Sequence, residues 1–124
     1  MNFCWCTVMV RDLDASVGFY QKALGLKVDR RFAMPQGGEL AFLSDGPAGA
    51  TQLELIHDDR ATANYRGTGI SIGFETRDLD AELERLEAAG IPVAKGPFTV
   101  GGGTRFFYIK DPDGLDVQIV QKGA

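Results

Sequence analysis

Only a few side chains of this 124-residue sequence are suited to catalytic chemistry. His57 is the single histidine, and Cys4 and Cys6 are the only cysteines. A nucleophile activated by a histidine base would therefore have to use His57. Alternation along a strand places His57 on the face of Leu55, so we interpret it as a solvated histidine at a strand end. We interpret the two cysteines as reduced, small, buried residues rather than as a metal or redox pair.

Glu54 and Trp5 are stronger candidates for binding a ligand. Glu54 lies between Leu53 and Leu55, and a carboxylate near apolar side chains is costly unless it is paired or hydrogen-bonded. Its predicted partner is either a ligand or Arg105 of the same chain. Trp5 offers a flat surface for stacking on an aromatic or cationic ligand, and an aromatic residue of the core or an interface is the alternative.

An internal repeat determines how these side chains are positioned. The sequence RDLDA occurs at 11–15 and at 77–81, 66 positions apart. The same offset relates FLSD at 42–45 to YIKD at 108–111, and an offset of 64 relates LELI at 53–56 to VQIV at 117–120. We therefore interpret the chain as two copies of one unit, about 1–60 and 67–121, within a single domain of residues 1–124.

Each copy is predicted to contain one strand, one helix and three further strands. Asp12 or Asp14 in the first copy, and the aspartates 66 positions later in the second, suit the start of a helix. Gly25 and Gly90 suit the left-handed ends of the two helices. The predicted fold is thus α+β, with two tandem βαβββ modules that form a cleft. The expected strands are 4–10, 26–33, 39–44 and 51–57, then 70–76, 91–98, 104–110 and 115–121.

A helix covers one face of each predicted sheet, and alternation identifies the side chains on the other face. Leu53 and Leu55 suit the helix side, so Glu54 points away from it. The repeat offset pairs Trp5 with Ser71. At least one of the aromatic residues 106–108 should also reach the cleft, and the polar segment 58–68 should be an exposed crossover. The predicted ligand-binding residues are Trp5, Thr7, Glu54, Ser71, Gln118, Arg105 and Phe107.

Composition excludes several classes of function. The net charge of −4 and pI of about 4.9 disfavour binding to nucleic acid and permit a cationic ligand. No apolar run approaches the roughly 20 residues of a membrane span. The N-terminus shows no signal peptide, so we expect a cytoplasmic protein that does not bind membranes. Open sheets leave strand edges and apolar surface exposed, which favours a homodimer.

The sequence resembles the vicinal oxygen chelate superfamily, which includes glyoxalase I, extradiol dioxygenases, and the bleomycin and fosfomycin resistance proteins. The resemblance lies in VRDLDAS at 10–16, Phe19-Tyr20, Leu24-Gly25-Leu26, and DPDG at 111–114 followed by the last strand. It extends over nearly the whole chain in the family's order. It implies the scaffold but not the activity, because members share a fold and differ in chemistry.

Enzymes of this superfamily hold a divalent metal with His and Glu side chains. The resemblance places the four ligand positions at Trp5, Glu54, Ser71 and Gln118. Only Glu54 is a charged oxygen ligand, because indole cannot bind a metal and neutral hydroxyl and amide groups bind weakly. We therefore expect no metal cofactor and no catalytic residue, with a divalent metal as the alternative.

Two functions from different classes follow. The first is a small-molecule binding protein of the glyoxalase/bleomycin-resistance type, in which an aromatic and acidic cleft holds a cationic or aromatic ligand. The second is a metal-dependent enzyme, either a glyoxalase-like lyase or isomerase similar to lactoylglutathione lyase or a dioxygenase. A regulatory domain without a ligand is a third class. Metal content separates the first two, and stabilisation by a ligand separates the third.

Overall fold

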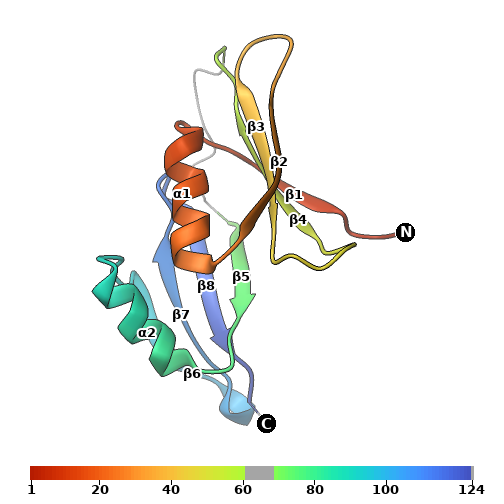
Figure 1. The fold of residues 1–124 in the computed structure, drawn as a ribbon. Helices are drawn as coiled ribbons and strands as arrows, with labels where there is room; N and C mark the ends of the chain where they lie inside the picture. The colour runs from red at the N-terminus through yellow and green to blue at the C-terminus, as the bar shows by residue number, and fades with distance from the viewer. Residues whose placement is uncertain (61–68, 124) are drawn as a thin grey trace. The chain divides into compact units, whose positions relative to one another are not determined.

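The computed structural model describes residues 1–60 and 69–123, so most of the expected crossover at 58–68 lies outside the described residues. The chain divides into two compact units, Met1–Arg66 and Gly67–Ala124. Each unit contains a four-stranded sheet and one α-helix (Figure 1). The predicted α+β fold with two βαβββ modules is confirmed.

The two units have the same topology. Strand order is β1-β4-β3-β2 in the first sheet and β5-β8-β7-β6 in the second. In each, the first strand is parallel to the last, and the other pairs are antiparallel. The elements of the first unit are β1 (Trp5–Met9), α1 (Leu13–Leu24), β2 (Lys27–Ala33), β3 (Glu39–Ser44) and β4 (Gln52–His57); those of the second are β5 (Ser71–Glu75), α2 (Leu79–Ala88), β6 (Lys95–Thr99), β7 (Arg105–Lys110) and β8 (Asp116–Gln121).

Both helices begin in the same way. Asp12 accepts a hydrogen bond from the backbone N–H of Ala15 at 3.1 Å, and Asp78 accepts one from Ala81 at 3.0 Å. Each carboxylate satisfies a first-turn N–H that has no partner within the helix. The structure thus selects Asp12 and Asp78 from the two aspartates that the sequence offered for each helix start.

The core of each unit lies between its sheet and its helix. In the first unit, alternate residues of β3 and β4 face α1, and Leu43, Leu55 and Tyr20 are fully buried. Phe107 and Val117 occupy the corresponding layer of the second unit, together with Leu79 and Leu86 of α2. The unpaired cysteines differ from the sequence prediction, because Cys4 is exposed ahead of β1 and Cys6 is only half-buried.

The DPDG turn connects β7 to β8 through the carboxylate of Asp111. Its Oδ1 accepts hydrogen bonds from the backbone N–H groups of Asp113 and Leu115, both at 2.9 Å. Gly114 has a φ of 87°, a left-handed conformation that glycine adopts without strain. This turn holds β7 and β8 in the register that aligns their side chains.

None of the helices among the described residues is long and apolar enough to cross a membrane.

Candidate functional site

The sheet face opposite α1, here called the open face of the first unit, carries a row of four polar and aromatic side chains. Thr7 is opposite Glu54, Glu54 is opposite Phe42, and Phe42 is opposite Arg30 in the strand register. Directly opposed side chains on one face of a sheet interact across the strands. The row therefore brings together a hydroxyl, a carboxylate, an aromatic ring and a guanidinium.

Glu54 has an internal hydrogen-bond partner in this row. The hydroxyl of Thr7 donates to Oε1 of Glu54 at 2.6 Å, a short distance typical of a bond to a carboxylate. Thr7 is exposed and Glu54 is half-buried. One hydroxyl uses only part of the acceptor capacity of a carboxylate, so Glu54 can accept further hydrogen bonds from a ligand.

Phe42 is the buried centre of the open face. Its residue exposure is only 3%, because Trp5 and Arg30 cover it. The indole of Trp5 meets the Phe42 ring edge-on at 5.2 Å between centroids and 71° between planes. The Arg30 guanidinium carbon lies 4.1 Å from the Phe42 ring centroid. Trp5 itself remains 44% exposed, so a ligand can reach its ring.

A pocket of about 330 Å³ adjoins this row at the start of β1 and β4. Trp5, Gln52 and Asp29 contribute to its lining, together with the loop 46–50. The amide of Gln52 donates to Oδ2 of Asp29 at 2.9 Å. Hydrogen bonds from Gln52 and Ser44 lower the pKa of the Asp29 carboxyl. The exposed indole thus borders a recess with a second carboxylate.

The second unit carries the equivalent row on the face opposite α2. Gly73 is opposite Gln118, Gln118 is opposite Tyr108, and Tyr108 is opposite Lys95. The Gln118 amide donates to the Tyr108 hydroxyl at 3.3 Å, and the Lys95 ammonium lies 4.5 Å from the Tyr108 ring centroid. Each unit thus places a cation of its outermost strand over an aromatic ring of the next strand.

The two rows differ in how the cation is neutralised. Lys95 forms an ion pair with Asp116 at 2.8 Å, and Lys110 pairs with the other carboxylate oxygen of Asp116. Lys110 first and Lys95 second lower the pKa of the Asp116 carboxyl. The first unit has Gln52 at the position of Asp116, 64 residues earlier. The carboxylate that neutralises the cation in one unit is therefore an uncharged amide in the other.

Asp116→Asn is expected to lower the free energy of unfolding by about 1 kcal/mol at pH 7. Because its pKa is lowered in the folded state, the Asp116 carboxylate stabilises the protein above its ordinary pKa of about 4. This stabilisation is lost as the pH falls through the lower folded-state pKa. Urea unfolding of wild type and variant across this pH range measures the effect.

Asp45→Asn is the matched control, because Asp45 is exposed and has no ion pair with another described residue. It should change stability little at any of these pH values. A difference between Asp116→Asn and wild type that stayed constant with pH would contradict the assigned ion pairs.

Two predicted site residues lie on the helix side of the second sheet instead of on its open face. Arg105 forms an ion pair with Asp80 of α2 at 3.0 Å, so the alternative in which it pairs with Glu54 is wrong. Phe107 is fully buried opposite Ile119 and packs in the core. Phe107 cannot reach a ligand on the open face, where its neighbour Tyr108 lies. His57 faces the helix side as predicted, with Nδ1 3.2 Å from the Val10 carbonyl oxygen.

Phe42, Tyr108 and Arg30 belong to the open faces; Phe42 and Arg30 were not selected from the sequence, and Tyr108 was offered only as one of the aromatic residues 106–108. The repeat contained a signal for the first two, because Phe42 and Tyr108 are 66 positions apart at the start of matching segments. Arg30 had no such signal. The predicted residues Trp5, Thr7 and Glu54 do meet on the open face of the first unit, while Gln118 and exposed Ser71 lie on that of the second.

The four positions equivalent to family metal ligands do not fit a transition metal. Trp5 packs its indole against Phe42, and the Gln118 amide nitrogen faces the Tyr108 hydroxyl. Glu54 supplies the one carboxylate, and it already accepts a bond from Thr7. Zn²⁺ sites ordinarily require three or four His, Cys, Asp or Glu ligands. The described residues contain no cluster of three such side chains.

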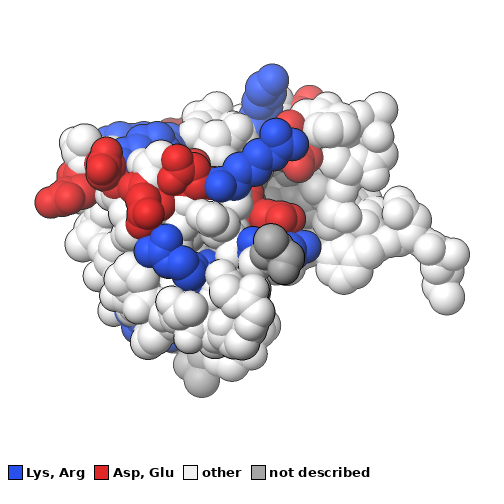
Figure 2. All heavy atoms as spheres, turned by 90° about the horizontal axis from the view of Figure 1, so that it is seen from below, with Lys and Arg blue, Asp and Glu red and all other residues white. Residues whose placement is uncertain are grey.

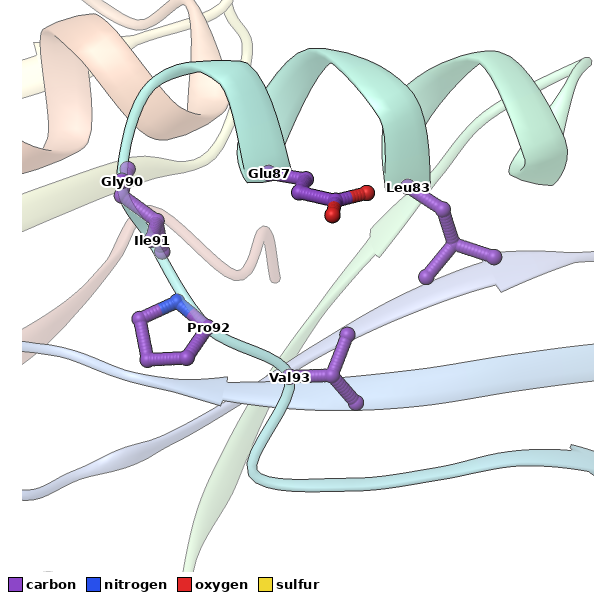
Figure 3. Close-up of a pocket in the computed structure, with 6 residues that line it drawn as sticks. All are labelled: Leu83, Glu87, Gly90, Ile91, Pro92 and Val93. Atoms are coloured by element: carbon purple, nitrogen blue, oxygen red, sulfur yellow. The ribbon is translucent and has the colours of Figure 1, made fainter.

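A larger hollow, of about 510 Å³, lies between α2 and the segment 90–93. Figure 3 shows Leu83 extending from α2 toward this segment and Val93 lying across from it. Among the described residues of its lining, Glu87 is the only one with an ionisable side chain. With one carboxylate among apolar groups, this hollow offers less chemistry than the open face.

On the face seen in Figure 2, acidic and basic side chains are interspersed, and the described residues form no extended basic area there.

The fold described above and the comparison with known protein families identify the class of this protein. The Glyoxalase/Bleomycin resistance protein/Dioxygenase superfamily matches residues 3–119, and the chain belongs to this superfamily. It is 35% identical to the uncharacterized protein YwbC of Bacillus subtilis, over 93% of both chains. It is 34% identical to a lactoylglutathione lyase of Haemophilus influenzae, over 98% of this chain and 93% of the relative.

The structure is also similar to glyoxalase I from Zea mays, with a TM-score of 0.86 and 25% identity over 99% of this chain and 45% of that one. The chain thus spans less than half the length of this plant protein. The same holds for the Arabidopsis thaliana lactoylglutathione lyase that it matches, of which it covers 44%.

Proposed function

We propose that this protein binds a small aromatic or cationic molecule without a metal cofactor and has no catalytic residue. The observation that carries the proposal is the open face of the first unit, where an exposed indole and a half-buried carboxylate flank the buried ring of Phe42. An aromatic surface can stack on a ring or a cation, and a carboxylate can orient a cationic or hydrogen-bond-donating group.

Trp5, Thr7 and Glu54 are the proposed binding residues of the first unit, and Ser71 and Gln118 are those of the second. That both faces line one cleft, that the protein is a cytoplasmic homodimer, and that residues 1–124 form a single domain all stay predictions. So do the absence of nucleic-acid partners and the absence of membrane binding.

Binding should be detected through Trp5, which is the only tryptophan. Benzylamine combines a ring with a cation, so it should quench or shift the Trp5 emission and raise the melting temperature, because it binds only the folded state. Trp5→Phe should keep the fold and weaken binding. A compound that raised the melting temperature with no change in Trp5 emission would place the binding site elsewhere.

A lactoylglutathione lyase is the second candidate function, favoured by the names of relatives that are 34% identical. An enzyme of this kind would need metal ligands other than those at the four expected positions. Elemental analysis of protein purified without chelator separates the two functions. We expect no stoichiometric Zn, Ni, Fe or Mn and no effect of EDTA on stability. About one equivalent of metal per chain would favour the lyase.

A further inference from the structure

We propose that Arg30 binds an anionic group, a carboxylate or phosphate, of the ligand on the open face of the first unit. This inference rests on the proposed function and adds a second charge to the ligand class. The starting observation is that Arg30 forms no hydrogen bond or ion pair with another residue in the described ranges 1–60 and 69–123. It is nevertheless held in place by aromatic rings.

The stacking of Arg30 leaves its hydrogen-bond donors available. Its guanidinium carbon lies 4.1 Å from the ring centroid of Phe42 and 5.9 Å from that of Phe32. Contact with a ring uses the flat face of the guanidinium, whereas the N–H donors point outward in its plane. A carboxylate or phosphate can approach in that plane and accept two parallel hydrogen bonds.

The second unit provides an internal comparison. There, Lys95 occupies the same place over Tyr108, and Asp116 neutralises it at 2.8 Å. In the first unit, Gln52 stands at the position of Asp116, and its amide donates to Asp29 instead. In the second unit, a carboxylate of the chain therefore forms an ion pair with the cation that lies over the ring. In the first unit, the corresponding cation has no such carboxylate among the described residues. A ligand anion would supply the missing charge.

The distance between Arg30 and Glu54 also determines how the charged groups must be spaced in a ligand that contacts both residues. Arg30 and Glu54 lie two strands apart, on either side of Phe42. Neighbouring strands are about 4.8 Å apart, so the two backbone positions are separated by roughly 10 Å. The arrangement suits a small molecule with an anionic group at one end, an apolar or aromatic middle over Phe42 and Trp5, and a cationic or hydrogen-bond-donating group near Glu54.

The test uses three aromatic probes that differ in one group: benzoate, phenyl phosphate and benzylamine. Their dissociation constants are measured with the full chain by Trp5 emission and by the shift in melting temperature, at constant ionic strength. Arg30→Gln should weaken binding of benzoate, phenyl phosphate or both by tenfold or more and should not weaken binding of benzylamine, which loses only a like-charge repulsion. Arg30→Lys should restore part of the loss. The preferred anionic probe distinguishes a carboxylate ligand from a phosphate ligand.

Arg77→Gln is the control, because it removes the same charge from an exposed position of the second unit. It should leave the binding of all three probes unchanged. Equal affinity of Arg30→Gln and wild type for the anionic probes would overturn the inference, as would failure of both anionic probes to bind wild type while benzylamine binds. Failure of all three probes would overturn the proposed function together with it.

Discussion

Leu55→Ala is expected to lower the free energy of unfolding by about 2–5 kcal/mol, the cost of removing a large side chain from a well-packed core. Leu55 is fully buried on the helix side of β4. Its truncation leaves a cavity that the rigid sheet cannot fill by relaxing. Urea unfolding, with a check that the dependence on denaturant is unchanged, measures the loss.

Ile56→Ala is the control for this prediction. Ile56 is the next residue of β4, points to the open face and is only half-buried. The Ile56→Ala substitution removes a similar apolar volume from the opposite side of the same strand. Because Ile56 is only half-buried, the loss of stability should be clearly smaller than for Leu55→Ala. Equal losses for the two variants would show that the two faces of the sheet are wrongly assigned.

Glu54→Gln should weaken the binding of benzylamine by about 1–3 kcal/mol, the range for a hydrogen bond that involves a charged group. The substitution keeps the size of the side chain and an oxygen that can accept from Thr7. The charge that attracts a cation is lost. Titration followed by Trp5 emission gives the dissociation constants of wild type and variant.

Glu39→Gln is the matched control, because Glu39 lies in the same sheet but faces α1 and pairs with Arg31 at 3.0 Å. It removes an identical charge from the other face and should leave benzylamine affinity unchanged. If Glu54→Gln also left affinity unchanged, Glu54 would be a structural partner of Thr7. Arg105 is not the partner of the Glu54 carboxylate, because Arg105 pairs with Asp80.

The order of elements and the two faces of most strands could be predicted from the sequence. Strand alternation and helix end signals act over a few residues, so they are visible without a three-dimensional structure. The repeat added information, because two copies of one pattern confirm each other. On this basis the sequence placed Trp5 and Glu54 on one face, and the register of β1 and β4 confirms that placement.

Side chains that meet across strands could be predicted less well. Arg105 was one of two expected partners of Glu54, the other being a ligand, but it pairs with Asp80 at the start of α2. Phe107 and Tyr108 are adjacent aromatic residues, so composition alone did not show which of them faces the core. β6 begins at Lys95 instead of about residue 91, and only Ala94 of the segment before it donates a backbone hydrogen bond to β7, to the Tyr108 carbonyl at 2.7 Å. These outcomes depend on distances between elements that are remote in the sequence.

What the sequence by itself determined is the tandem βαβββ fold, and it predicts that only Glu54 of the four positions equivalent to family metal ligands carries a side chain suited to a metal. The tertiary structure decided the position of Arg30. Val28 is opposite Leu43 on the helix side, whereas Arg30 is opposite Phe42 on the open face, because the register shifts between them. Strict alternation would put Val28 and Arg30 on the same face. One extra residue in a strand reverses the faces that follow it, and only pairing with the neighbouring strand shows where this occurs.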